Sequence, residues 1–209
     1  MIKDWVGNKK TTFAILGASN HSEWDREKND YYATDPNVIL DLIHFEEFSP
    51  TNNYKYFEQE SNFNVWEPAC GEWHLSKELE KHWFNVKSTD LINRWYWKWW
   101  IDFLKSQDKF NWHIITNPPY KYAKEFVEKA MELIPEWKKV AMFLKLQFLE
   151  WQSRKKLFQK YPPKKVYVYS KRQMCAKNWE FEKYKSNAIA YAWYVWEKGF
   201  KWKPQIEWI

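Results

Sequence analysis

The residues best suited to chemistry form one short run, Asn117-Pro118-Pro119-Tyr120, directly after the apolar segment Ile114-Ile115-Thr116. A β-branched segment of this kind predicts a buried strand. Two consecutive prolines must end that strand, because they cannot donate ladder hydrogen bonds. The turn therefore holds an amide, a carbonyl and an aromatic ring at the carboxyl end of a strand, where open α/β sheets bind ligands. Taken alone, the run also fits a plain proline turn.

Three further polar positions follow predicted strands. The segment Glu67-Pro68-Ala69-Cys70-Gly71-Glu72 joins a strand to a helix, a junction where nucleotide-like ligands meet backbone amides. Asp90 ends the next strand about 20 residues on, where an acidic side chain can bond a ribose hydroxyl. Asp102 follows a third short apolar segment. Each position alone also fits a helix or turn cap, but the ordered set predicts a cleft for a cofactor and a substrate.

The elements that must position these residues alternate between strand and helix. Asp35 before Pro36 predicts a helix start, because aspartate caps helices and proline suits the first turn. The predicted strands span residues 63–67, 85–90, 114–116, 139–146, 166–170 and 188–196, and the predicted helices span 36–48, 74–81, 122–134 and 149–160. This order predicts an α/β fold with a doubly wound, mostly parallel sheet and helices on both faces.

Composition limits the class of protein. We expect a single domain over residues 1–209, in which 1–30 form an N-terminal arm and 49–62 a polar connection. No stretch resembles a transmembrane helix or a signal peptide, so we expect a cytoplasmic protein without a membrane partner. Cys70 and Cys175 form neither a disulfide framework nor a metal site, so we expect no metal.

The chain is basic, with a net charge of +6 and a pI of about 9.0, which permits a polyanionic partner. One stretch concentrates this charge and either tracks phosphates or is a solvated face. Its residues are Arg154, Lys155, Lys156, Lys160, Lys164, Lys165, Lys171 and Arg172.

Tryptophan and glycine usage is abnormal: there are 17 Trp and 4 Gly, whereas average usage would give roughly 15 Gly. Nine tryptophans fall where turn chemistry favours glycine. These are Trp73, Trp83, Trp95, Trp97, Trp99, Trp100, Trp137, Trp151 and Trp179. Trp66, Trp193 and Trp196 instead fit apolar strands. We hypothesise that the gene uses UGA for glycine and that UGA was translated as tryptophan.

The ordered motifs resemble a known enzyme family. The segment Glu67 to Glu72 is similar to the S-adenosylmethionine loop of the amino-group DNA methyltransferases, and Asn117 to Tyr120 is similar to their catalytic signature. Tyr32, Thr34 and Pro36 resemble the N-terminal cofactor motif. More narrowly, the chain from about residue 17 onward resembles small phage-type adenine-N6 methyltransferases, including residues 143–150 and 190–197. That family has a glycine at the position of Trp73.

The resemblance implies S-adenosylmethionine as cofactor and adenine in duplex DNA as substrate. Asn117 and Pro118 would accept hydrogen bonds from the adenine amino group, Pro119 would keep the turn rigid, and Tyr120 would stack on the flipped base. The implied cofactor-binding residues are Tyr32, Thr34, Glu67, Pro68, Ala69, Gly71, Asp90 and Asp102.

Other functions stay open on the sequence. The Asn-Pro-Pro-Tyr signature also serves methylation of a glutamine amide in a protein, and adenine in RNA is a further substrate class. A non-enzymatic binder of single-stranded nucleic acid would suit the basic charge and many aromatics. With no room for a large target-recognition domain, the arm, residues 49–62 and residues 171–187 would supply sequence recognition.

Overall fold

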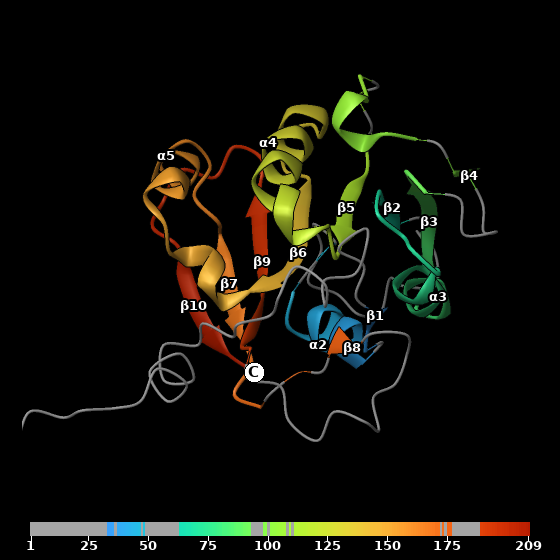
Figure 1. The fold of residues 1–209 in the computed structure, drawn as a ribbon, viewed down its shortest axis with the longest axis horizontal. Coiled ribbons are helices and arrows are strands. Elements are labelled where there is room, and N and C mark those ends of the chain that lie inside the picture. Colours follow the sequence, from blue (N-terminus) through green and yellow to red (C-terminus); the bar gives the residue numbers. More distant parts are fainter. Residues whose placement is uncertain are drawn as a thin grey trace, which may run out of the picture.

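A single large sheet forms the centre of the protein. The computed structural model describes residues 33–35, 37–46, 48, 63–92, 98–99, 101–107, 109, 111–171, 173, 175–176 and 189–209. Eight strands lie in the order β10-β7-β9-β6-β5-β2-β3-β4 (Figure 1). They are β2 (Phe63–Glu67), β3 (Phe84–Asp90), β4 (Lys98–Trp99), β5 (His113–Thr116), β6 (Lys139–Lys145), β7 (Lys165–Val168), β9 (Tyr191–Glu197) and β10 (Gln205–Trp208).

The sheet is mostly parallel, as predicted. Strand β9 runs antiparallel to both of its neighbours, β6 and β7, while every other neighbouring pair in this sheet is parallel. A separate two-stranded antiparallel pair joins β1 (Ala33–Thr34) to β8 (Cys175–Ala176).

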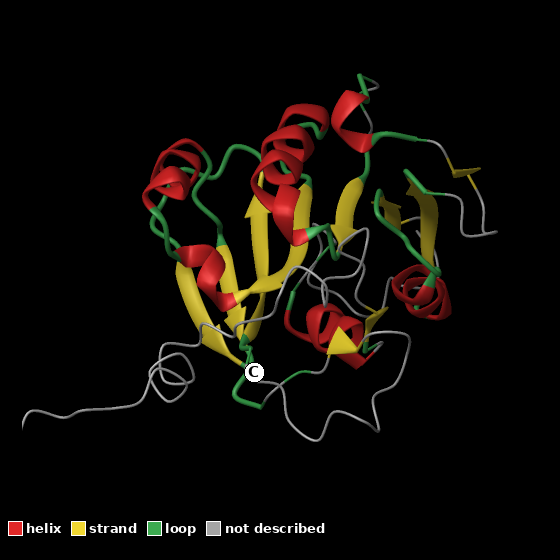
Figure 2. Ribbon diagram, in the orientation of Figure 1, coloured by secondary structure: helices red, strands yellow, loops and turns green. Residues whose placement is uncertain are grey.

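Helices cover both faces of the sheet, which confirms the doubly wound α/β fold (Figures 1 and 2). The α-helices are α2 (Asn37–Phe45), α3 (His74–Lys81), α4 (Ala123–Leu133) and α5 (Gln152–Lys160), and the 3-10 helices are η3 (Phe103–Lys105), η4 (Tyr120–Tyr122) and η5 (Leu146–Leu149). One core packs α4, α5 and η3 against the sheet, and the other packs α2 and α3 against its opposite face.

The strand sequences explain the two cores. Successive side chains of a strand point to opposite faces, so Trp66 joins the core under α4 while its neighbour Val65 joins the core under α2. Ile114 and Ile115 divide in the same way. Central strands buried on both faces need continuous apolar runs, and residues 139–144 and 191–196 are buried without interruption.

A buried ion pair fixes the end of α2 against the sheet. Lys139 Nζ lies 2.6 Å from Glu46 Oε1, and the Tyr167 hydroxyl donates to Glu46 Oε2 at 2.7 Å. The backbone N–H of Lys139 donates to His113 Nδ1 at 3.1 Å. Because the Lys139 and Glu46 side chains are both buried, each charge depends on the other for its stability.

Several predicted boundaries need correction. The strand 63–67 and the helix 74–81 occur with the expected bounds, but residues 146–149 form a 3-10 helix and α5 begins only at Gln152, not at 149. Helix α2 ends at Phe45, and the N–H of Asn37 donates to Asp35 Oδ1 at 2.9 Å, as expected of a cap. Strand β10 was not predicted, because its exposed edge position leaves no buried face in the pattern. The arm 1–30 and residues 49–62 lie outside the described residues.

Candidate active site

The candidate site lies where the order of strands reverses. From β2 the chain adds β3 and β4 on one side of the sheet, whereas β5 and β6 lie on the other side. Ligands of open α/β sheets bind at the carboxyl ends of the strands at such a switch point. Strand β2 ends at Glu67, β3 ends at Asp90, and Asn117 follows the end of β5. The structure therefore brings these three predicted positions to one edge of the sheet.

The loop after β2 is tied to the end of β3. The N–H of Cys70 donates to the Thr89 carbonyl at 3.0 Å, and the N–H of Gly71, whose φ is 54°, donates to Asp90 Oδ2 at 2.8 Å. The other oxygen of Asp90 accepts the N–H of Ile92 at 2.8 Å. These two bonds orient the Asp90 carboxylate. Because a carboxylate oxygen can accept more than one hydrogen bond, Asp90 can also accept one from a hydroxyl group.

At this edge of the sheet, the carboxyl group of Glu67 has a strongly raised pKa. Its side chain is 1% exposed, and burial, reinforced by the charge of Asp90, raises its pKa to about 8, against an opposing hydrogen bond from Ser76. The Ser76 hydroxyl donates to Glu67 Oε2 and lies 2.6 Å from the Ser88 hydroxyl. Within the described part of the chain, Glu67 Oε1 has no hydrogen-bond partner. A donor or cation from a ligand would satisfy it.

The Asn117 to Tyr120 turn is rigid and its ring is held in place. Pro118 is buried, and the N–H of Tyr122 donates to the Pro119 carbonyl at 2.9 Å, which begins η4. The Tyr120 ring is half-buried, with Lys145 Nζ 4.8 Å and the Tyr191 ring 6.1 Å from its centre. A cation over an aromatic face is attractive, so these contacts fix the orientation of the ring.

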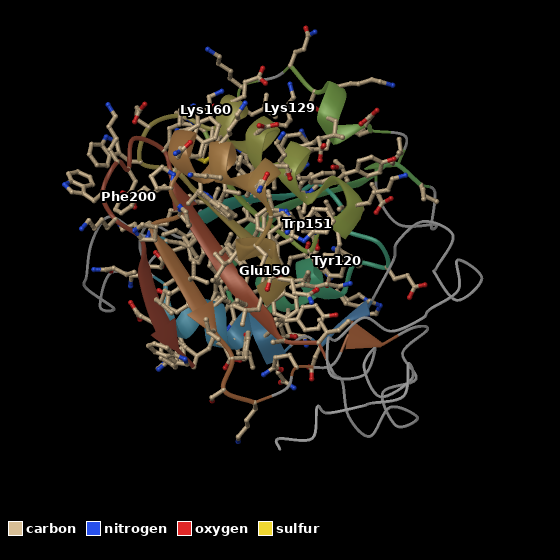
Figure 3. The ribbon with its side chains drawn as sticks, turned by 60° about the vertical axis from the view of Figure 1, so that its left-hand side comes forward. Tyr120, Lys129, Glu150, Trp151, Lys160 and Phe200 are labelled. Atoms are coloured by element: carbon tan, nitrogen blue, oxygen red, sulfur yellow. The ribbon has the colours of Figure 1, made fainter. Side chains whose placement is uncertain are left out.

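A cavity of about 110 Å³ opens beside Tyr120, on the side of α5. Figure 3 shows Tyr120 and Trp151 close together near the centre of the view, where both line this cavity. The cavity is lined by Tyr120, Ala123, Leu144, Lys145, Gln147, Phe148, Trp151 and Arg154. Arg154 is held by its bond to the Gln147 carbonyl at 3.0 Å and lies 4.5 Å from the centre of the Phe148 ring. Aromatic walls with two cations suit a flat, anionic ligand.

The other predicted residues have separate positions. Asp102 caps η3: its Oδ1 accepts the N–H of Leu104 at 3.1 Å and its Oδ2 lies 3.2 Å from Lys105 Nζ. It lies three residues beyond the end of β4, not at a strand end as expected. Thr34 ends β1 in register with Cys175, whereas Tyr32 and Pro36 lie outside the described residues. Pro68 is buried and Ala69 half-buried in the loop after β2.

Sequence reasoning missed four residues of this region. Ser76 and Ser88 complete the Glu67 network, and nothing in their spacing announces it. Lys145 ends β6, the strand next to β5, so the rule that singled out the polar ends of the other strands could have found it. Arg154 was assigned only to the basic stretch. Among the described residues, no group of three or more His, Cys, Asp or Glu forms a metal site. In the same part of the chain, no helix has the length and apolar character needed to span a membrane.

The sequence matches no family model and no curated protein, but solved structures have the same fold. A candidate class I S-adenosylmethionine-dependent methyltransferase from Listeria monocytogenes is 14% identical, with a TM-score of 0.58 over 96% of this chain and 71% of its own. DrdV in complex with DNA is 13% identical, with a TM-score of 0.54 over 93% of this chain and 29% of its own. A protein from Agrobacterium tumefaciens described as an O-methyltransferase is 8% identical, with a TM-score of 0.50 over 69% of this chain and 78% of its own. The chain has the Rossmann-like fold of the class I methyltransferases.

Proposed function

We propose that this protein transfers a methyl group from S-adenosylmethionine to the N6 amino group of adenine in DNA. The observation that carries the proposal is the convergence of three ordered motifs on the switch point of the sheet. Glu67 ends β2, Asp90 ends the adjacent β3, and Asn117 to Tyr120 follow β5 on the other side of β2. The order and types of these residues are those of the amino-group methyltransferases that the sequence resembles.

The residues after β2 and β3 suit the cofactor. S-adenosylmethionine, when bound, supplies the methyl group and carries both a ribose and cationic groups. Asp90 is oriented by two backbone N–H groups and would accept the ribose hydroxyls. The unpaired Oε1 of Glu67 would accept a donor from the cationic end, which favours the ionised carboxyl. Pro68, Ala69 and Gly71 would form the loop wall. Tyr32, Thr34 and Asp102 complete the proposed set through the family resemblance.

The residues after β5 suit the substrate. The amino group of adenine is a weak nucleophile, because its lone pair is delocalised into the ring. Hydrogen bonds from this group to the Asn117 side-chain oxygen and the Pro118 carbonyl would localise the lone pair, and acceptors held in a proline turn need no reorganisation. The base must leave the duplex to reach them. Tyr120, fixed by Lys145, supplies the ring on which it stacks.

Charge supports a nucleic-acid substrate. The cavity beside Tyr120 carries Lys145 and Arg154, and Lys155, Lys156 and Lys160 are exposed further along α5. Cations in this row would contact the phosphates around a flipped nucleotide and make binding salt-dependent. DrdV, which has the same fold over 93% of this chain, was solved in complex with DNA, and this agrees with the DNA substrate that the sequence resemblance implies. The arm 1–30, residues 49–62 and residues 171–187 are the proposed recognition segments of a single domain.

Nucleoside analysis after incubation with labelled S-adenosylmethionine tests the proposal. We expect N6-methyladenine in duplex DNA, and its loss in Asn117→Ala but not in the matched control Asn64→Ala. Asn64 lies towards the opposite end of β2, where its side-chain oxygen accepts a hydrogen bond from the exposed Asn85 side chain at 2.7 Å. Parallel incubations with RNA and with a glutamine-containing protein cover the other substrate classes. Product confined to one of those, or nucleic-acid binding without any methylated product, would overturn the proposal.

A further inference from the structure

Every positive φ angle in the described ranges belongs to either glycine or tryptophan. Gly71 and Gly199 have φ angles of 54° and 91°. The four others are Trp73 at 69°, Trp83 at 66°, Trp137 at 69° and Trp151 at 82°. Asparagine and aspartate enter this region most readily among residues with a side chain, yet they supply none of these positions. A bulky aromatic residue is among the least suited to it.

Two of the four tryptophans occupy turns that require glycine. Trp83 follows the C-cap of α3, and its N–H donates to the Glu80 carbonyl at 3.2 Å. This bond is typical of an α-helix that ends with one residue in the left-handed conformation. Trp137 is the third residue of a turn in which the N–H of Lys138 donates to the Pro135 carbonyl at 3.3 Å. A positive φ at the third residue alone defines a type II turn, where glycine is the usual occupant.

The other two tryptophans precede helices. Trp73 is the N-cap of α3, with φ 69° and ψ 20°, and makes no side-chain cap. Trp151 is the N-cap of α5, with φ 82° and ψ 129°. N-caps normally carry Ser, Thr, Asp, Asn or Gly, since the first four bond the open backbone N–H groups and glycine exposes them. The angles of Trp151 lie outside even the left-handed helical region, towards backbone space used almost only by glycine.

Side-chain exposure independently separates three of the four residues, whereas Trp73 is half-buried with Lys77 Nζ 5.1 Å from the centre of its ring. Trp83, Trp137 and Trp151 are 77%, 74% and 72% exposed. By contrast, Trp66, Trp193 and Trp196 lie in strands and are at most 1% exposed. Each of their indole N–H groups donates a hydrogen bond. Trp66 donates to the Thr89 hydroxyl at 2.8 Å, Trp193 to the Val38 carbonyl at 2.8 Å, and Trp196 to the Tyr161 carbonyl at 3.1 Å. The three strand residues behave as tryptophans, as predicted from the sequence. The exposed three leave most of the indole in solvent, and the ring of Trp151 meets the Arg154 guanidinium at 5.5 Å.

We infer that positions 73, 83, 137 and 151 are glycine in the functional protein, encoded by UGA. The backbone angles assign these four positions individually, which the glycine deficit of the sequence cannot do. Trp99 lies in β4, while Trp95, Trp97, Trp100 and Trp179 lie outside the described residues, so the angles assign none of these five.

Two of the four positions touch the proposed ligand sites, and this step rests on the proposed function. Residue 73 ends the cofactor loop and begins α3, where glycine would let a ligand approach the backbone N–H groups. Residue 151 lines the cavity beside Tyr120 (Figure 3). With tryptophan at 151 this cavity has a volume of about 110 Å³, which is smaller than the roughly 300 Å³ of the smallest typical ligand pockets. Removing the indole at 151 enlarges it.

Thermal unfolding tests the four positions without reference to activity. The written chain is the protein with the printed sequence, which has tryptophan at all four positions. We expect the W73G/W83G/W137G/W151G variant to unfold at a higher temperature than the written chain, by roughly 2 °C per position and about 8 °C in total. The W202G/W208G variant is the matched control, because Trp202 and Trp208 are 67% and 72% exposed without a positive φ. It should unfold no later than the written chain. A W66G variant should unfold earlier. Equal or lower stability of the fourfold variant would overturn the inference.

Two further measurements separate this inference from the proposed function. Peptide masses of the protein isolated from its source cell should show glycine at all four positions, and tryptophan at any of them would overturn the assignment there. Calorimetry with S-adenosylmethionine should show tighter binding for W73G, by at least about tenfold, and no change for W83G on the far end of α3. Glycine in the isolated protein without cofactor binding by W73G would leave the assignment intact and refute the proposed function.

Discussion

Replacing the Glu67 carboxyl by an amide should flatten the pH dependence of stability above pH 6.5. Burial is the main cause that raises the pKa of Glu67 to about 8, and the charge of Asp90 adds to it. In the unfolded chain the same carboxyl has a pKa near the ordinary value of 4.5. Between these two values the folded protein holds a proton that the unfolded chain has released, so the proton stabilises the fold.

The direction and size of the effect follow from this difference in bound protons. The free energy of unfolding falls by about 1.4 kcal/mol per pH unit where only the folded state binds the proton. His113 acts in the opposite direction: burial, with Lys138 and Lys139 nearby, lowers its pKa to about 3, so its contribution is lost as pH falls below 6.5. The two effects oppose each other between pH 4.5 and 6.5. From pH 6.5 to 8 the Glu67 contribution remains and amounts to roughly 1.5 to 2 kcal/mol.

Urea unfolding of the written chain and of Glu67→Gln at half-unit steps from pH 6.5 to 8 measures this contribution. Glutamine keeps an acceptor for the Ser76 hydroxyl but cannot ionise, so the difference in unfolding free energy between the two proteins isolates Glu67. We expect that difference to change by roughly 1.5 to 2 kcal/mol across the interval. Glu125→Gln, at an exposed position of α4, should follow the slope of the written chain. Parallel profiles for the written chain and Glu67→Gln would refute a raised pKa.

Three further predictions concern the cleft and the core. Asn117→Ala should lower the rate of methyl transfer by about 10²-fold or more without changing cofactor affinity. Single-turnover kinetics measures the rate and calorimetry measures the affinity. An equal loss of rate and affinity would contradict the assigned role of Asn117. Asp90→Ala should weaken cofactor binding by about tenfold or more without changing DNA affinity, because it removes the acceptor that orients the Gly71 loop. Lys139→Met should destabilise the fold by about 3 to 5 kcal/mol in urea unfolding, since it leaves Glu46 buried and uncompensated, and Glu46→Gln added to it should recover most of the loss.

The fold and the place of the site were predictable because strong local signals agreed. The run 63–67 ends at a proline and a glycine loop, so both the strand and the following helix appear with the predicted bounds. Parallel strands place their carboxyl ends at one edge of a sheet, so the order of strands alone groups Glu67, Asp90 and Asn117. The sequence pattern does not predict polar contacts between distant residues. The Ser76 hydroxyl bonds Glu67 and lies beside the Ser88 hydroxyl because α3 packs across β2 and β3.

The start of α5 was wrong for a reason that the backbone explains. The predicted strand runs to residue 146 and the predicted helix begins at residue 149, and nothing in the residue types at 150 and 151 marks a break after that start. In the structure Glu150 is extended, with ψ 177°, and residue 151 has a positive φ, so η5 and α5 are separate. A glycine at 151 would have marked this break in the sequence.

Asp90 and Asp102 show why a sequence alone does not separate a cap from a ligand-binding carboxylate. Asp90 is the last residue of β3 and Asp102 follows β4 by three residues, and both accept the N–H of the residue two positions on. Among the described residues, the Asp102 carboxylate contacts Leu104 and Lys105 of its own turn, so local structure accounts for it. Asp90 also accepts the N–H of Gly71, 19 residues away, and so joins the end of β3 to the loop after β2. Asp90 therefore lies at the switch point, where open α/β sheets bind their ligands. Asp90 therefore carries the cofactor proposal more strongly than Asp102 does.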